Sequence, residues 1–391
     1  MLERKSMVCL FALLFLIFSR AFAGWFPDRF NTDLSGYVSE LPLVTFEKID
    51  DLSFSNIINA RGNFRYFPTP SLNFELAVRL QLLTGDLIAL GQPENPIIEL
   101  LEEDRGYFDL SRAWSAILFG NIDRAFVSYS QRSFHLRVGR QRINWGTNLV
   151  WNPNDWFNAF DYLDFDYDER PGSDAVRIQY FTGVLSVVEA VVGAAASSEE
   201  WTYALMYRFN RWGYDLQFQG GLFGNDAAAG LSYSGDIRGG GFRGEISSYY
   251  PVLGDEDNND NGITVVASIS GDYTFPNGLY LLSEVLYNGF GEDEFIDTIP
   301  LLTHDITAKD LTPARYLLYG SVSYPFSPII RGSLSVMLNP SDLSFLTMPS
   351  VDWSLSDNLD LLAIAQLYSG DGGELFGMLP NLVSLRLRWF F

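Results

Sequence analysis

The chain has 391 residues, of which 47% are hydrophobic and 15% aromatic, and its formal net charge is −22 at pH 7. This acidic balance excludes nucleic-acid binding by phosphate neutralisation. The single cysteine, Cys9, excludes a disulfide framework and metal sites built on cysteine. No apolar run after residue 23 is long enough for a membrane-spanning helix. A transmembrane β-barrel uses such a composition, because its strands need only about 10 residues of alternating character.

The first 23 residues predict a secretory signal peptide. Residues 4–5 are basic, residues 7–18 are apolar, and residues 21–23 (AFA) form a small-residue cleavage site, so the mature chain would begin at Gly24. A single membrane anchor is the alternative, but the apolar run is shorter than the roughly 20 residues that span a bilayer. Cys9 lies near the start of this run, whereas a lipid-attachment cysteine would follow it.

Segments with the period-2 alternation of β-strands recur along the rest of the chain. In Leu72–Leu82 aliphatic or aromatic residues alternate with polar, charged or small residues, which fits lipid on one face and water on the other. We predict eighteen strands, an even number as in closed barrels, and merging one hairpin would leave sixteen. The predicted strands are 35–47, 56–66, 71–83, 121–130, 133–142, 174–182, 184–193, 201–210, 213–222, 227–235, 238–250, 263–275, 278–288, 314–325, 328–338, 345–354, 359–369 and 381–391.

The last predicted strand, Asn381–Phe391 (NLVSLRLRWFF), has an aliphatic face that ends in Trp389 and Phe391. This pattern resembles the closing-strand signal of bacterial outer-membrane proteins, which the outer-membrane assembly machinery reads. The alternative is the edge strand of a soluble β-sandwich, but an exposed apolar row of this kind would aggregate. The strand therefore favours a membrane barrel and assigns Trp389 and Phe391 to the insertion signal.

The connections between the predicted strands alternate in length. Those after even-numbered strands are short and rich in turn residues, as periplasmic turns are. The long ones follow odd-numbered strands, as extracellular loops would. We therefore predict an all-β, antiparallel up-and-down barrel, with residues 1–23 as signal peptide and residues 24–391 as a single barrel domain. The long connections are 84–120, 143–173, 251–262, 289–313 and 370–380.

Acidic residues are concentrated in the predicted long connections. Loss of residues 1–23 would remove three basic residues and one acidic residue, so the mature chain would carry a formal charge of −24. Such loops either attract cations or simply keep the surface solvated. The acidic runs are Glu99–Asp104, Asp161–Glu169, Asp255–Asp260 and Glu292–Asp297.

One acidic loop partly matches a calcium-binding loop. Asp257, Asn259, Asn261 and Gly262 fit the first half of the D-x-[DN]-x-[DN]-G pattern. Ser268 stands where the pattern has its bidentate glutamate, and it lies in a predicted strand. A weak Ca²⁺ site and a merely solvated loop both remain open, and the sequence predicts no other metal or cofactor.

Arginines recur on the face of the predicted strands that does not contact lipid. An arginine on the lipid side at the bilayer midplane would cost roughly 2–4 kcal/mol, so the lumen is the favourable place. Arg140 and Arg142 would break this rule by strict alternation; either a β-bulge at Gly139 turns them inward or they lie above the membrane. The predicted pore-lining residues are Arg61, Arg65, Arg79, Arg124, Arg137, Arg140, Arg142, Arg177, Arg386 and Arg388.

The run RVGRQRINWG (Arg137–Gly146) resembles the GRQ…G wall strand of porin-like outer-membrane barrels, including the alginate-export and phosphate-selective groups. In general porins the third loop folds into the barrel and its acids face arginines of the wall. The resemblance therefore implies a constriction in the third extracellular loop, residues 143–173, where the tryptophans either offer stacking faces to a solute or merely pin the loop. The predicted constriction residues are Trp145, Trp151, Asp155, Trp156, Asp161, Asp164, Asp166, Asp168 and Glu169.

The resemblance implies a channel in the cell outer membrane for the diffusion of small polar or charged solutes. Its partners would be the lipid bilayer and lipopolysaccharide. A homotrimer is a possible assembly. A closed barrel that acts in adhesion or binding is an alternative. An outer-membrane hydrolase is a weaker one, because the only histidines, His135 and His304, accompany no nucleophile or metal motif.

Overall fold

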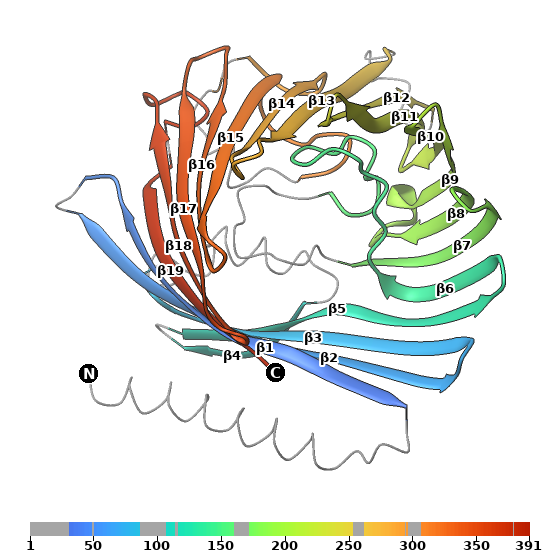
Figure 1. Ribbon diagram of the computed structural model, residues 1–391, viewed down its shortest axis with the longest axis horizontal. Coiled ribbons are helices and arrows are strands. Elements are labelled where there is room, and N and C mark those ends of the chain that lie inside the picture. The colour runs from blue at the N-terminus through green and yellow to red at the C-terminus, as the bar shows by residue number, and fades with distance from the viewer. Residues whose placement is uncertain are drawn as a thin grey trace.

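The computed structural model describes residues 31–48, 51–86, 107–113, 116–159, 172–252, 262–293, 295, 306–377 and 379–391. These residues form one antiparallel sheet that closes on itself, because β1 pairs with both β2 and β19 (Figure 1). The strands are β1 Thr32–Phe46, β2 Leu52–Thr69, β3 Leu72–Gly85, β4 Tyr107–Ala113, β5 Ala116–Gln131, β6 Phe134–Gln141, β7 Ser173–Gly183, β8 Ser186–Ala194, β9 Thr202–Arg211, β10 Tyr214–Phe223, β11 Asp226–Ile237, β12 Gly240–Pro251, β13 Thr264–Thr274, β14 Tyr280–Asn288, β15 Tyr316–Ser327, β16 Ile330–Leu338, β17 Phe345–Ser356, β18 Leu359–Ser369 and β19 Asn381–Phe390.

The ring of the barrel consists of eighteen strands. Strand β4 pairs only with the first part of β5, while β3 pairs directly with β5, so β4 lies beside the ring and not in it. The predicted fold class and strand number are therefore confirmed. Strand β4 was missed, because it falls inside the connection that the sequence predicted as residues 84–120.

Side chains alternate between the two faces of the wall. In β19, Val383, Leu385 and Leu387 are 41%, 50% and 42% exposed, whereas Ser384 and Arg388, on the opposite face, are 2% and 5% exposed. Aliphatic residues therefore face outward, toward lipid, and polar residues face the lumen. Among the described residues, no helix is long and apolar enough to cross a membrane.

The barrel closes where the first and last strands, β1 and β19, meet. The amide of Gly36 donates to the carbonyl of Phe391, and the amide of Phe391 donates to the carbonyl of Gly36, each at 3.0 Å. A Cβ on Gly36 would lie 2.2 Å from the carbonyl oxygen of Arg61 and 2.6 Å from the ring of Phe391. Glycine is thus required at this seam, because only hydrogen leaves room for the terminal ring.

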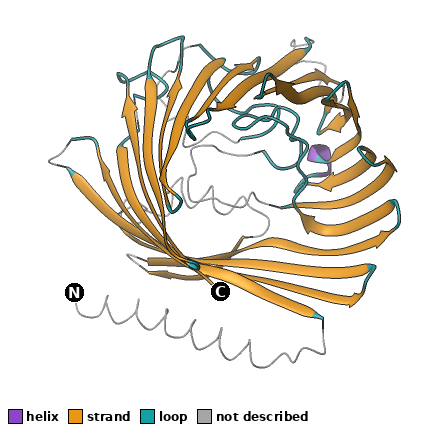
Figure 2. Ribbon diagram, in the orientation of Figure 1, coloured by secondary structure: helices purple, strands orange, loops and turns teal. Residues whose placement is uncertain are grey.

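Short turns lie at one rim of the barrel and long connections at the other (Figure 2). Most of these turns have two residues, among them Trp212-Gly213 between β9 and β10 and Arg238-Gly239 between β11 and β12. All four have positive φ angles, between 56° and 87°, as tight hairpin turns require. The predicted alternation of short and long connections is therefore confirmed.

The segment that follows β6, here called the inner loop (residues 142–159), lies inside the ring (Figure 2). Its apolar side chains join the largest buried cluster of the described residues, together with lumen-facing residues such as Met206, Tyr249 and Leu286. The hydrophobic core therefore lies within the barrel, between this loop and part of the wall.

Candidate functional site

Glu245 on β12 holds the inner loop by its backbone. Its Oε1 accepts hydrogen bonds from the amide of Thr147, from the hydroxyl of Thr147 at 3.0 Å and from the amide of Asn148 at 2.7 Å. Its Oε2 accepts from the amide of Asn154 at 2.9 Å. The carboxylate is 4% exposed, so these bonds form away from bulk water. Glu245 thus joins the two ends of the segment 147–154.

Glu284 on β14 binds the middle of the same segment. Its Oε2 accepts from the amides of Leu149 and Val150 at 3.3 and 3.1 Å, and its Oε1 accepts from the amide of Trp151 at 2.7 Å. The residue is 1% exposed. Main-chain amides aimed at a carboxylate form strong, charge-assisted hydrogen bonds. Two wall carboxylates therefore fix the course of the loop.

The tryptophans of the inner loop are buried against the wall. Trp145 and Trp156 are 1% and 4% exposed, and their indole nitrogens donate to Glu189 Oε1 at 2.7 Å and to Ser247 Oγ at 3.0 Å. Trp151, 4% exposed, packs edge-on against the ring of Tyr319. Buried rings offer no stacking face to a solute, so this geometry favours the interpretation that the tryptophans pin the loop.

Amide and hydroxyl side chains of the wall donate hydrogen bonds to main-chain carbonyls of the loop. Gln217 and Gln219 on β10 donate to the carbonyls of Trp145 and Asn154 at 2.8 and 2.9 Å. Ser268 on β13 donates to the carbonyl of Trp151 at 3.0 Å. These hydrogen bonds reach β8, β10, β12, β13 and β14, and the ring contact of Trp151 reaches β15, so all of them belong to one arc of the ring.

An arginine cluster lies on a different arc, formed by β2, β3 and β5. Arg61 Nη1 lies 2.9 Å from Asp123 Oδ2, and Arg79 Nη2 lies 3.5 Å from Asp123 Oδ1. Arg124 Nη1 donates to the carbonyl of Asp123 at 2.6 Å. All four side chains are nearly enclosed, with exposures between 2% and 6%. Of the predicted pore-lining residues, the structure thus brings Arg61, Arg79 and Arg124 together around one acid, and we call this set the arginine cluster.

A β-bulge at Asp123 makes this grouping possible. Ala77 pairs with Arg124 and Val78 pairs with Ile122, so Asp123 is an extra residue in β5. Because of that extra residue, both Asp123 and Arg124 can face the lumen, although they are adjacent in the sequence.

The bulge predicted at Gly139 is absent. The register of β6 runs through Gly139 without a shift against both β5 and β7. Gly139 instead has a φ of +116°, a conformation that favours glycine. Arg140 is nevertheless 9% exposed, and its Nη1 lies 3.7 Å from Asp174 Oδ2. The shift of register on this wall lies in β5, one strand away from the predicted position.

The other predicted arginines lie apart from this cluster. Arg65 is half exposed and contacts Asp33 and Glu75 at 3.6 and 3.4 Å. Arg177 Nε lies 2.7 Å from Glu189 Oε1. The guanidinium of Arg137 lies over the ring of Phe126, and that of Arg388 over the ring of Tyr37, while Arg142 and Arg386 are partly buried.

Most of the acids predicted for the constriction lie outside the described residues. Asp155 is the exception: it is fully buried in the inner loop, and its Oδ1 accepts from the amide of Trp145 at 3.4 Å. Trp389 and Phe391 pack against each other with ring centroids 5.6 Å apart, and their role in insertion stays a prediction. The residues outside the described part are Asp161, Asp164, Asp166, Asp168 and Glu169, and also the calcium candidates Asp257, Asn259 and Asn261.

Three wall acids that hold the loop were not predicted from the sequence: Glu189, Glu245 and Glu284. Each stands at a lumen-facing position of its strand, and Glu284 is the one charged residue of its strand, YLLSEVLYN. That isolated acid was the available signal. In the described part of the loop, acids of the wall bind its main-chain amides and the indole of Trp145, contacts that the sequence did not predict.

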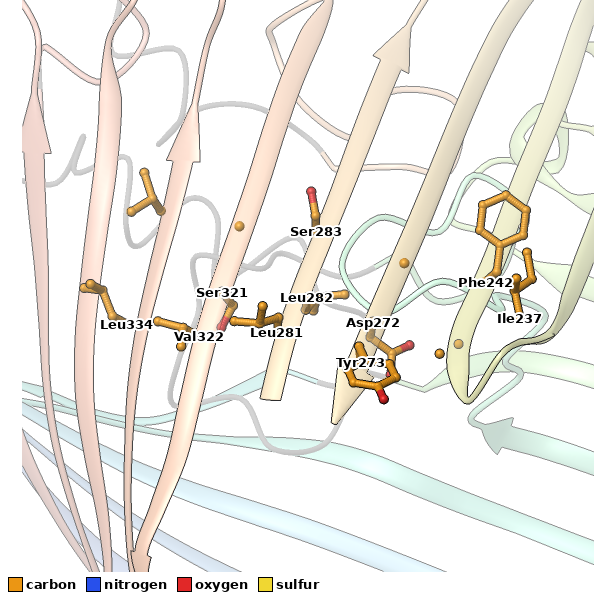
Figure 3. A pocket seen from close by; sticks show the side chains of 15 residues that line it. Ile237, Phe242, Asp272, Tyr273, Leu281, Leu282, Ser283, Ser321, Val322 and Leu334 are labelled. Atoms are coloured by element: carbon orange, nitrogen blue, oxygen red, sulfur yellow. The ribbon is translucent and has the colours of Figure 1, made fainter. Parts of the chain in front are cut away.

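A shallow hollow of about 660 Å³ lies outside the lumen, across β12 to β16 (Figure 3). Leu281, Val322 and Leu334 line it, and both leucines belong to the exposed, outward-facing rows of their strands. The hollow is therefore part of the lipid-facing surface and not of the interior site.

No family model matches the sequence, and no curated protein matches it. Solved structures match the fold. Acinetobacter baumannii OccAB4 has a TM-score of 0.57 at 10% identity, covering 94% of this chain and all of that one. A. baumannii OccAB3 has 0.57 at 10%, covering 92% and 99%. Pseudomonas aeruginosa OccD3 (OpdP) has 0.54 at 8%, covering 92% and 91%. At these identities the similarity supports the barrel architecture alone.

Proposed function

We propose that this chain is an outer-membrane channel for the diffusion of small polar or charged solutes. The observation that carries the proposal is the inner loop, a segment held inside a closed barrel by buried hydrogen bonds to one arc of the wall. A barrel with an apolar outside and a polar, partly filled inside is the architecture of a restricted aqueous pore.

The proposed solute path lies between the inner loop and the arginine cluster. The loop is bound to β8–β14, while Arg61, Arg79 and Arg124 lie on the arc formed by β2, β3 and β5. Arg61 and Arg79 contact the carboxylate of Asp123 and Arg124 binds its main-chain carbonyl, so these four residues together carry a net positive charge. Such a field orders water and favours solutes that bear charge or a large dipole.

The proposal places the chain in the cell outer membrane, in contact with lipid and lipopolysaccharide. The outward row of β19, ending in Trp389 and Phe391, supports recognition of the C-terminus by the assembly machinery. We propose a homotrimer as its assembly. We propose no enzymatic activity for the chain.

Conductance across a planar lipid bilayer tests the proposal. We expect the refolded protein to add discrete current steps, and heat-denatured protein to add none. Blocking by a panel of neutral, anionic, cationic and zwitterionic solutes would then rank the solute classes. Absence of any current over the whole voltage range would overturn the proposal and favour a closed barrel that acts in adhesion or binding.

A further inference from the structure

The inner loop is bound chiefly through its own backbone. Six main-chain amides, those of residues 147–151 and of Asn154, donate to only two side chains, Glu245 and Glu284. Each glutamate uses both of its carboxylate oxygens. Because the contacts reach the main chain, they depend little on which side chains the loop carries.

These two carboxylates differ from three other acids of the described lumen wall, which pair with arginines. Glu189 pairs with Arg177, Asp123 pairs with Arg61, and Asp272 pairs with Arg243. In the part of the chain that the structure describes, neither Glu245 nor Glu284 forms an ion pair with a lysine or arginine. Their charge is balanced by the loop's amide dipoles, since a buried carboxylate needs donors that favour its charged form.

We propose that Glu245 and Glu284 are positioning residues that hold the inner loop as a fixed constriction. The inference rests on the proposed channel function and names the groups that set its geometry. Without two full carboxylates, some amides of segment 147–154 lose their acceptor. The loop then detaches from the wall for part of the time. As a result, the cross-section of the lumen that is open to solute fluctuates.

Isosteric variants test this with little change of shape. Glu245→Gln and Glu284→Gln each replace one accepting oxygen by a donating NH₂ group, which faces a loop amide that is also a donor. We expect the parent channel to carry a steady current and each variant to show stepwise fluctuations between levels. Asp272→Asn is the matched control, because it makes the same chemical change on β13 next to Arg243, away from the loop contacts described.

A reversible lock separates loop movement from general damage. The side chain of Asn148 donates to the hydroxyl of Ser268, so cysteines at these two positions would join the loop to β13. The pair is introduced with Glu284→Gln into a chain that lacks Cys9. Thiol titration verifies that the disulfide forms. We expect fluctuations under reducing conditions and a steady current after oxidation.

The two proposals fail in different ways. Steady currents in both glutamine variants, or fluctuations that persist after the lock has formed, would overturn the positioning role while leaving the channel intact. If the parent conducts no current at all, the proposed channel function is wrong. Limited proteolysis then still tests whether Glu245 and Glu284 hold the inner loop. Cleavage within residues 142–159 of the glutamine variants, but not of the parent or of Asp272→Asn, would support it, and equal cleavage would reject it.

Discussion

Arg61 and Asp123 form an ion pair of 2.9 Å in which the two side chains are only 2% and 1% exposed. Arg79 approaches the other carboxylate oxygen of Asp123 at 3.5 Å. One acid from the bulge in β5 therefore lies among guanidinium groups from β2 and β3. At such low exposure the charges are weakly screened, so loss of the acid would change the local field strongly.

Asp123→Asn should make the channel more selective for anions. The change removes the negative charge among Arg61, Arg79 and Arg124 and keeps the size of the side chain. Under a potassium chloride gradient, we expect the zero-current potential to move toward the chloride equilibrium potential.

Asp215→Asn is the control for this prediction. It removes the same formal charge from an exposed residue that bonds Asn210 beside a short turn, far along the ring from β5. An equal shift in both variants would show that the arginine cluster has no special influence on the permeating ion.

Gly36→Ala should weaken closure of the barrel. The added methyl group would lie 2.2 Å from the carbonyl oxygen of Arg61 and 2.6 Å from the ring of Phe391, so the seam must open or distort. Overpacking of this kind costs roughly 1–3 kcal/mol. We expect a lower midpoint of thermal unfolding in lipid vesicles and a smaller fraction of the compact, heat-modifiable form on gels.

Gly62→Ala provides a matched control, because Gly62 is the direct cross-strand partner of Gly36 and a Cβ there meets nothing within 4 Å. Its unfolding midpoint should stay close to that of the parent. If Gly62→Ala lowers the midpoint as much as Gly36→Ala does, crowding at the seam is not the cause.

The fold could be predicted because a membrane imposes a repeated demand on every strand. Each strand must turn apolar residues outward, so Val383, Leu385 and Leu387 stand out against Ser384 and Arg388 in the sequence alone. Strand β4 was not predicted, because it pairs only with the first part of β5 and is not one of the eighteen strands of the ring. The bulge was misplaced because a glycine permits a bulge without requiring one, whereas the true shift involves Asp123, whose partners are remote in sequence.

The candidate site could be predicted only in part. Alternation placed Arg61 and Arg79 on the lumen side, and the position in the chain identified the loop. The contacts between the loop and the wall could not be predicted from the sequence. Trp151, for example, binds Glu284, 133 residues away, through its main-chain amide. A backbone donor leaves no pattern in the loop sequence, so the partner acids could not be identified by matching side chains.

Glu40→Leu should stabilise the barrel in a bilayer. Glu40 is exposed, pairs across strands with Ile58 and Leu387 of the outward rows, and lies between the fully buried Ser39 and Leu41. Its carboxylate therefore faces lipid and, among the described residues, accepts a hydrogen bond from the Asn56 side-chain amide at 3.3 Å. Acids cost less there than arginine or lysine, so we expect a gain of roughly 1–2 kcal/mol in the free energy of unfolding.

Denaturant titration of vesicle-inserted protein measures this gain, with Glu47→Leu as the control. Glu47 is also exposed but follows the end of β1. A gain for Glu47→Leu as large as that for Glu40→Leu would attribute the effect to lower net charge and not to removal of an acid from the lipid face.

Trp145→Phe should loosen the inner loop without changing the outer face of the barrel. The substitution removes the indole N–H that donates to Glu189 Oε1 at 2.7 Å, in a site where the ring is 1% exposed. Loss of a buried hydrogen bond to a charged group costs about 1.5–3 kcal/mol. Glu189 keeps its bonds from Arg177 and Gln179, so the acid stays in place and the loss falls on the loop. We expect faster amide hydrogen exchange in residues 142–159.

Trp353→Phe, at an outward-facing ring that is 42% exposed, should leave that exchange unchanged. Protection of the loop that is unaltered in Trp145→Phe would mean that the tryptophan fills space there and does not anchor the segment.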